Sequence, residues 1–276
     1  MGTKQQGTRQ RLSLSRQWDL IENFGQRDLK VRFKGSVLGW LWSLVVPLAT
    51  LAIYSVVFSV LLRVPPPDLP GGRPGVFVLW LFCGLIFWTF FTGVVNNGIV
   101  ETIAAGPILQ KVYFPAYAPV MGAGLAVSIQ SLIEVGLLMI TLLFIGNVSW
   151  TWLLFPILAI LVVAFTASLA TCVAVLNIYY RDLAHLVTIA LQLLFYATPI
   201  IYPLTMAPEN WHGLPLQAII AASPFHSFVE LMRSIFYGLN PGSWTLWLTA
   251  VAWTAVALAL ATWVMHSKGQ DMGENV

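Results

Sequence analysis

The sequence is most distinctive for its scarcity of charged side chains. Only 9% of the 276 residues are charged, whereas 58% are hydrophobic and 12 are Trp. Because a soluble domain carries about 25% charged residues, we expect most of this chain to contact lipid rather than water. The two cysteines, Cys83 and Cys172, both fall in apolar segments, which favours packing over a disulfide or a metal pair.

Motifs for bond-making chemistry are also missing. The sequence contains no Gly-Lys dipeptide of a phosphate-binding loop, no His-Glu-x-x-His, no Cys-x-x-Cys and no Gly-x-Ser-x-Gly. Four histidines are scattered without metal-ligand spacing: His185, His212, His226 and His266. We therefore predict no catalytic residue, no metal site and no cofactor bound by this chain. Transport against a gradient would need energy from a partner or an ion.

Six apolar segments are long enough to cross about 30 Å of hydrocarbon. They lie at residues 38–62, 76–96, 118–145, 151–176, 184–202 and 244–265. Pro47 is expected to kink the first of them. The sequence thus predicts an all-α integral membrane protein in three parts, with an N-terminal tail 1–37, a transmembrane domain 38–265 and a C-terminal tail 266–276.

The distribution of basic residues predicts the orientation of the chain. If the N-terminus is cytoplasmic, the inner segments hold 11 of the 14 Lys and Arg, and the outer segments hold Arg63, Arg73 and Arg233. The positive-inside rule therefore favours cytoplasmic termini. The +3 net charge does not indicate a nucleic-acid partner, because basic residues collect at membrane edges.

Residues 12–25 have the pattern of an amphipathic helix. Their larger apolar side chains recur at helical spacing, at Leu14, Trp18, Ile21 and Phe24. Such a helix could lie on the membrane surface among lipid headgroups, or it could pack against another subunit. The pattern leaves both interpretations open.

Residues 203–243 differ from the other connections. Two apolar-leaning stretches, 214–222 and 225–237, are each too short to span, and Ser223-Pro224 separates them. We predict two short helices that form a re-entrant hairpin on the outer side, which requires protein or water to cover the backbone. The alternative is a seventh span, which would place the C-terminus outside.

Glu134 is the carboxylate that falls deepest within a predicted span. An ionisable residue at this depth is a candidate functional group. The alternative is a protonated or hydrogen-bonded glutamate that bridges two helices, and we favour it because a proton relay needs several such groups.

Several longer motifs occur in an order that resembles one family. They are Arg27-Asp28-Leu29-Lys30-Val31-Arg32-Phe33-Lys34, Ser36-Val37-Leu38-Gly39, Leu41-Trp42, Lys111-Val112-Tyr113-Phe114-Pro115, Tyr180-Arg181-Asp182-Leu183 and Thr198-Pro199-Ile200-Ile201-Tyr202-Pro203. Together they resemble the membrane subunit of ABC-2 type polysaccharide exporters, which move O-antigen, teichoic acid or galactan. The chain departs from the family pattern at Phe33, where Tyr is usual, and at Ser223-Pro224, where Asn-Pro is usual.

The resemblance implies an assembly and a set of site residues. Two copies of this chain would pair with two copies of an ABC nucleotide-binding subunit that carries ATP and magnesium. The N-terminal interface helix and a cytoplasmic coupling helix at 97–111 would dock on that subunit. Residues 203–243 would supply the outer gate helices, with gate residues at Pro224, Phe225 and Arg233. The residues expected to couple to the ATPase are Trp18, Glu101, Lys111, Arg181 and Asp182.

The basic residues Arg27, Arg32 and Lys34 have two interpretations. They could contact anionic lipid headgroups, or they could recognise the diphosphate of a lipid-linked substrate at the cytosolic entry. Positive-inside topology alone accounts for their charge.

Aromatic residues in the early spans suggest a path for sugars, because sugar C–H faces stack on aromatic rings. Individual rings could equally belong to the interfacial belt or to packing. The rings expected to line a channel are Trp40, Trp42, Tyr54, Phe58, Phe87, Trp88 and Phe91.

These observations predict the pore-forming permease of an ATP-driven exporter of lipid-linked polysaccharide. Its location would be the cytoplasmic membrane, and its partners would be the ATPase, a second copy, the substrate and lipids. The alternatives are a drug or lipid exporter of the same fold and, less favoured, an ion-coupled carrier or membrane enzyme that depends on Glu134.

Overall fold

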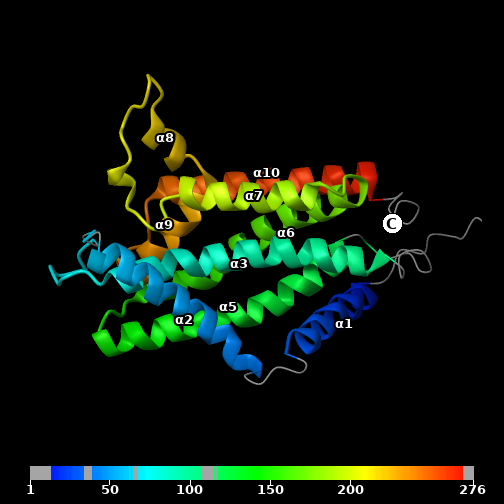
Figure 1. Ribbon diagram of the computed structural model, residues 1–276, viewed down its shortest axis with the longest axis horizontal. Coiled ribbons are helices and arrows are strands. Elements are labelled where there is room, and N and C mark those ends of the chain that lie inside the picture. Colours follow the sequence, from blue (N-terminus) through cyan, green and yellow to red (C-terminus); the bar gives the residue numbers. More distant parts are fainter. Residues whose placement is uncertain are drawn as a thin grey trace, which may run out of the picture.

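The computed structural model describes residues 14–33, 39–61, 63–64, 67–106, 115 and 117–269. Within these residues every regular element longer than an isolated bridge is a helix (Figure 1). The all-α architecture predicted from composition is therefore confirmed for the described part of the chain.

Five helical segments among the described residues are long and apolar enough to cross a membrane. The first consists of α2 (Trp42–Tyr54) and a π-helix (Ser55–Leu61), and the helix continues through Pro47. The others are α3 (Phe77–Ala104), α5 (Tyr117–Ile145), α6 (Phe155–Tyr179) with a preceding 3-10 turn (Trp150–Leu154), and α10 (Trp244–Lys268). The chain is thus a multi-pass membrane protein.

Helix α3 is the central element of the bundle. It packs against α5, α6 and α9 (Pro224–Phe236), and Figure 1 shows it running between α5 and the α6–α10 pair. At 1.5 Å per residue its 28 residues extend about 42 Å, which exceeds the hydrocarbon thickness of about 30 Å. The helix thus continues to Ala104, past residue 96, where the second span was predicted to end. Much of the predicted 97–111 coupling helix is this continuation, and residues 107–111 lie outside the described residues.

The fifth predicted span is shorter than expected. Helix α7 (Leu183–Ala197) has 15 residues, or about 22 Å, and it ends before Thr198-Pro199 rather than at 202. Proline fixes its own φ and disfavours the α conformation in the residue before it, and Thr198 is extended, so the helix ends at this dipeptide. Within the described residues, five candidate spans are therefore found where six were predicted.

The N-terminal amphipathic segment is a longer helix than expected. Helix α1 (Leu14–Phe33) includes most of the basic collar and packs against α5 through Ile21 and Phe24. The two helices approach most closely at Gly25 and Gly122, where a Cβ added to Gly122 would lie 2.4 Å from the Cβ of Phe24. Trp18 lies outside this contact and is 57% exposed. Within the chain, α1 therefore packs on the bundle.

Two helices occupy the region 203–243. Helix α8 (Leu216–Ala221) lies at the edge of the bundle, whereas α9 is almost entirely buried. The first residues of α9 contact Phe91, and the residue after it, Tyr237, contacts Val76 at the start of α3. Helix α9 therefore runs antiparallel to α3 along the outer part of the bundle.

Candidate functional site

A groove between α2, α3 and α7 is lined by both aromatic and neutral polar side chains. It has a volume of 330 Å³. Its lining comes from all three helices and is made up of Thr50, Tyr54, Leu85, Trp88, Thr89, Thr92, Asn96, Thr188, Leu191, Gln192, Phe195 and Tyr196. None of these twelve residues is charged, so the groove combines aromatic rings with neutral hydrogen-bonding groups.

Aromatic rings form one wall of the groove. The ring of Phe195 stacks on Tyr54 with a centroid distance of 6.0 Å and lies 5.6 Å from the ring of Trp88. Offset and tilted ring pairs at such distances stabilise packing beyond the area that they bury. The α2, α3 and α7 sides of the groove are therefore joined by one aromatic cluster.

Two of the predicted channel aromatics lie in this lining, and two do not. Tyr54 and Trp88 face the groove, but Phe87 and Phe91 are 2% and 3% exposed in the core. Phe87 packs on Phe228 at 5.2 Å, and Phe91 packs on Phe165 at 6.1 Å. Phe87 and Phe91 therefore do not line this groove, because they project from α3 toward α6 and α9.

The remaining predicted aromatics are dispersed. Phe58 packs beside Phe77 near the outer end of α2, and Trp42 is 47% exposed at its start. The side chain of Trp40 lies outside the described residues.

The polar residues of the groove were missed from the sequence, although a signal for them exists. Thr92 and Asn96 follow Trp88 at intervals of four, and Thr188, Gln192 and Tyr196 do the same on α7. Residues four apart share one face of a helix. A polar stripe of this kind within an apolar helix marks a surface that faces something other than lipid.

Glu134 lies directly behind the groove wall. It is 1% exposed on α5, and its Oε1 accepts a 3.2 Å hydrogen bond from Nε2 of Gln130. Its Oε2 lies 3.2 Å from the hydroxyl of Thr89, which lines the groove on α3. These contacts agree with the interpretation of a glutamate that bridges helices through hydrogen bonds.

At the other end of α3, two predicted site residues contact each other. The guanidinium of Arg27 on α1 pairs with the carboxylate of Glu101, and its cation lies 5.3 Å from the ring centroid of Phe24. Arg27 was expected at substrate entry and Glu101 at coupling, yet the structure joins them as a bridge between α1 and α3. Lys34 and Lys111 lie outside the described residues, as does the side chain of Arg32.

The turn between α6 and α7 carries the other two predicted coupling residues. Arg181 and Asp182 are both exposed. Asp182 occupies the N-cap position of α7, but its side chain makes no capping hydrogen bond. Instead, Oδ1 of Asn177 accepts a 2.9 Å hydrogen bond from the backbone N–H of Ala184. Asn177 at the end of α6 thus fixes the start of α7.

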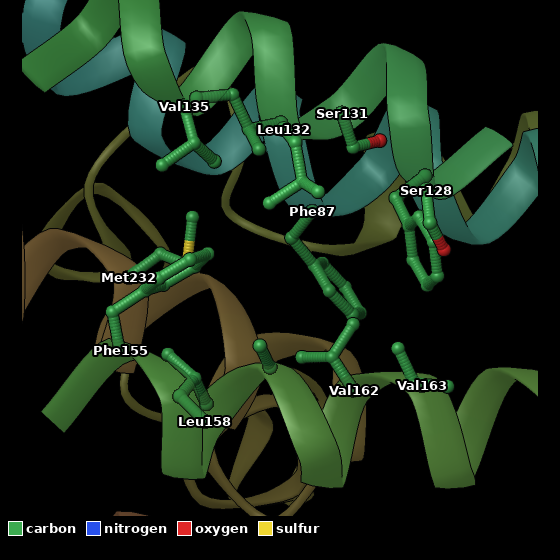
Figure 2. A pocket seen from close by; sticks show the side chains of 13 residues that line it. Phe87, Ser128, Ser131, Leu132, Val135, Phe155, Leu158, Val162, Val163 and Met232 are labelled. Carbon is green, nitrogen blue, oxygen red and sulfur yellow. The ribbon is translucent and has the colours of Figure 1, made fainter. Parts of the chain in front are cut away.

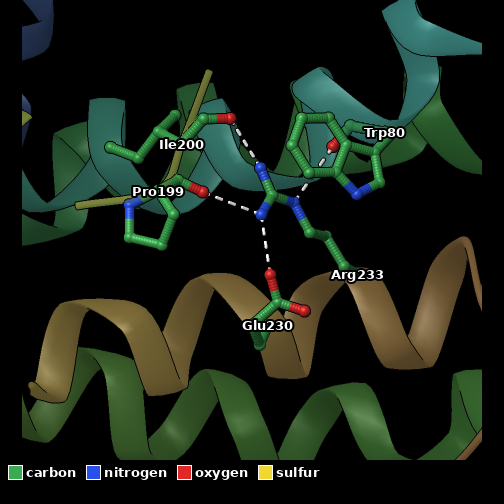
Figure 3. Close-up of polar contacts among 5 residues, drawn as sticks. All are labelled: Trp80, Pro199, Ile200, Glu230 and Arg233. Carbon is green, nitrogen blue, oxygen red and sulfur yellow. Dashed lines mark hydrogen bonds and ion pairs between the residues drawn. The ribbon is translucent and has the colours of Figure 1, made fainter. Parts of the chain in front are cut away.

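Arg233 of α9 is buried near the start of α3, at 3% exposure, in contacts that Figure 3 shows. Its guanidinium donates to the backbone oxygens of Pro199 at 2.8 Å and Ile200 at 2.5 Å, and it pairs with Glu230 at 2.7 Å. It also stacks over the ring of Trp80, 3.5 Å from the centroid. Arg233 therefore joins α9, the start of α3 and the non-helical turn after α7.

The other two predicted gate residues lie at the start of α9. Pro224 and Phe225 are both buried, and the ring of Phe225 lies 5.1 Å from Phe91 and 6.0 Å from Trp88. Phe225 thus packs behind the groove wall, beside Trp88. Whether this helix moves as a gate stays a prediction.

A second set of polar contacts fastens the outer loops and was not foreseen. Nδ2 of Asn147 donates to the carbonyls of Phe236 and Tyr237, and its Oδ1 accepts from Arg73 at 2.8 Å. The Tyr237 hydroxyl donates to Pro67 at 2.6 Å, and burial raises the pKa of this phenol, which favours its protonated, donating form. These groups satisfy carbonyls that the end of α9 leaves without helical partners.

A different hollow lies between α5 and α6 and is almost purely apolar. Figure 2 shows Leu132 and Val135 of α5 facing Phe155 and Leu158 of α6, with Met232 of α9 at its base. It has a volume of 210 Å³. Because so few polar groups face it, it offers neither water nor sugar adequate hydrogen bonding, so the groove rather than this cavity is the candidate site.

Neither hollow has the groups for catalysis. Among the described residues, no cluster of three or more His, Cys, Asp or Glu could hold a metal ion. The arrangement can hold a ligand by stacking and neutral hydrogen bonds, but it presents no nucleophile with an activating base.

Comparison with known proteins identifies the family. Residues 21–237 match the family model described as ABC-2 type transporter, so the chain belongs to the ABC-2 type transporter family. The O-antigen export system permease protein RfbA of Klebsiella pneumoniae is 32% identical over 222 residues, which cover 79% of this chain and 80% of that protein. The protein of the same name in Myxococcus xanthus is 29% identical over 261 residues, 93% of this chain and 95% of that protein. The chain is accordingly a transport subunit rather than an enzyme.

Proposed function

We propose that this chain is the pore-forming permease of an ATP-driven exporter of lipid-linked polysaccharide. Two copies would assemble with two ABC nucleotide-binding subunits in the cytoplasmic membrane, and ATP and magnesium would bind to those partners. The observation that carries the proposal is the uncharged groove of aromatic and hydroxyl groups between α2, α3 and α7. The similarity to O-antigen export permeases supports the same cargo class.

The chemistry of the groove suits a polymer that must slide. Aromatic faces attract the C–H faces of sugar rings, while neutral side chains exchange hydrogen bonds with sugar hydroxyls. Charged side chains would hold a passing sugar more tightly through stronger hydrogen bonds. A neutral, aromatic surface therefore binds each sugar weakly enough for the chain to leave.

The end of the bundle where α1 meets α3 supplies a route that would couple the groove to the ATPase. Helix α1 contacts the extended end of α3 through Arg27 and Glu101, and the exposed Arg181–Asp182 turn leads directly into α7. With both termini in the cytosol, a push on either element by the ATPase would move a wall of the groove. The buried packing of α9 against α3 would relay that movement to the outer end.

The first test is purification of the tagged chain from its native membranes in mild detergent, followed by mass spectrometry and an ATPase assay. We expect an ABC ATPase to co-purify near equal stoichiometry and to hydrolyse ATP. Recovery of the chain alone, without ATPase activity, would contradict the proposed assembly.

A second test addresses the groove directly. Tyr196→Ala removes an exposed ring from the groove, whereas Leu193→Ala on the same helix removes a side chain that is 66% exposed and does not line it. We expect Tyr196→Ala to lower surface display of polysaccharide at unchanged protein level and Leu193→Ala to leave it near wild type. Equal display in both variants would argue against passage through this groove.

A further inference from the structure

The groove presents its hydroxyl groups in an unusual way. All four of its threonines, Thr50, Thr89, Thr92 and Thr188, have the hydroxyl within 2.9 to 3.0 Å of the backbone carbonyl four residues earlier. A hydroxyl has one proton and two lone pairs. The protons of Thr50, Thr92 and Thr188 are directed to their own helices. The proton of Thr89 is directed either to its own helix or to the carboxylate of Glu134 behind the wall. These side chains therefore offer the groove acceptor lone pairs and methyl groups.

Few donors remain to balance these acceptors. Among the twelve lining residues, the side-chain donors left over are the amides of Asn96 and Gln192, the phenols of Tyr54 and Tyr196, and the indole of Trp88. Aromatic faces carry partial negative charge, which adds to the excess of electron-rich, accepting groups in the groove. The surface therefore favours ligands that donate hydrogen bonds, as sugar hydroxyls do.

No cation faces the groove from its described lining. The nearest carboxyl group is that of Glu134, one layer behind the wall through Thr89. The buried guanidinium of Arg233 is engaged by Glu230 and by the carbonyls of Pro199 and Ile200, outside the groove. Pores that conduct anions or phosphates are lined by rings of Arg or Lys, and the described lining of this groove contains neither residue.

We infer that the groove selects a glycan with an uncharged backbone and discriminates against polyanionic chains such as poly(glycerol phosphate) or polyuronate. Each phosphate or carboxylate that entered would lose hydration, meet acceptor lone pairs and π-faces, and find no positive partner. Neutral hexoses gain stacking and donate to the threonine oxygens. This inference rests on the proposed function and narrows its substrate class.

The test uses the complete complex with its ATPase, reconstituted in liposomes. Two synthetic probes share the same polyprenyl diphosphate carrier, one bearing a neutral hexose homopolymer and the other a poly(glycerol phosphate) of equal length. We expect the neutral probe to stimulate ATP hydrolysis about tenfold more strongly, a ratio that corresponds to about 1.4 kcal/mol.

The possible outcomes distinguish failure of this inference from failure of the proposed function. Equal stimulation by both probes, or stimulation by the anionic probe alone, overturns the inference and leaves polysaccharide export standing. Stimulation by neither probe overturns the proposed function, and the inference falls with it.

A matched set of variants tests the charge argument inside the groove. Gln192→Lys adds a cation at an exposed groove position, Gln192→Glu adds an anion of similar size, and Gln192→Met is the neutral control. We expect the lysine variant to raise the response to the anionic probe severalfold relative to the methionine variant, while the glutamate variant does not. If the lysine and glutamate variants respond alike, the groove charge does not select the cargo and the inference is wrong.

Discussion

Arg233 shows how one residue makes a break in a membrane helix tolerable. The turn after α7 leaves the carbonyls of Pro199 and Ile200 without helical partners where the protein buries them away from solvent. The planar guanidinium serves both carbonyls, Glu230 and the face of Trp80 at once, which an ammonium could not do. A cation that would be costly in lipid is therefore stabilised by the same backbone carbonyls whose hydrogen bonding it satisfies.

Arg233→Met should destabilise the protein by about 3–5 kcal/mol, because it leaves Glu230 and two buried carbonyls without their partner. The stability of Arg233→Lys should lie between those of Arg233→Met and wild type, because lysine keeps the charge but loses the planar, forked guanidinium. Thermal unfolding of the purified protein in detergent measures both. Glu230→Gln is the control and should cost less, because Glu230 is 30% exposed. A wild-type melting temperature for Arg233→Met would show that the contacts contribute little.

Asn177 and Asp182 make a second residue-scale prediction. Asn177→Leu should lower stability by about 1 kcal/mol, because its side chain caps the first turn of α7, whereas Asp182→Ala should leave stability unchanged. Thermal unfolding of the two purified variants in detergent measures their stabilities against wild type. If Asp182→Ala then impairs export, the loss reports on contact with a partner rather than on folding. A stability loss confined to Asp182→Ala would contradict the assignment of the cap.

At the scale of elements, the crossing of α1 and α5 depends on the absence of side chains. The added Cβ at Gly122 would also lie 3.0 Å from the backbone N of Gly25. Backbone atoms cannot give way as a flexible side chain can, so the two helices would have to separate. Small residues that permit such close approach are common where helices pack within membranes.

Gly122→Ala should therefore displace α1, although alanine in a helix interior is otherwise favourable by up to about 1 kcal/mol. Faster proteolysis of the N-terminal segment and weaker co-purification of the ATPase would be the expected readouts. Gly136→Ala on the same helix is the control, because a Cβ there meets no atom within 4 Å. Similar behaviour of the two variants would mean that the close crossing is not required.

Helix α3 has two faces with different tasks. Leu85, Trp88, Thr89, Thr92 and Asn96 line the groove, whereas Phe87 and Phe91 pack in the core. Both faces are rich in large apolar side chains, so the helix has almost no preferred apolar direction. This is why the sequence identified aromatic residues in α3 but could not assign them to the groove or to the core.

At the scale of the whole molecule, the groove and the Arg27–Glu101 contact lie at different positions along the same helix. Glu101 near the end of α3 pairs with α1, and Asn96 one turn earlier belongs to the groove lining. A rigid helix transmits a displacement at one end along its length. In the assembly proposed above, the Arg27–Glu101 pair would link docking of the ATPase to the groove wall.

Glu101→Gln and Arg27→Gln should each reduce export with little effect on stability, since a partly exposed ion pair contributes about 0–1 kcal/mol. The double variant should be no worse than either single variant, because both changes remove the same interaction. Polysaccharide display and ATPase activity of the complex are measured together, and ATP hydrolysis that continues without export indicates uncoupling. Additive defects would show that the two residues act separately.

Composition and pattern alone determined the class of this protein. Scarce charge and long apolar runs require helices in a bilayer, because in hydrocarbon each backbone polar group must be satisfied within its own segment. The same reasoning located α5, α6 and α10 to within four residues at each end. Tertiary structure decided which face of each helix meets the groove, that Asn177 rather than Asp182 caps α7, and that Arg27 contacts Glu101. Those facts depend on contacts between residues distant in the sequence or on opposite sides of a turn, and local periodicity carries no information about them.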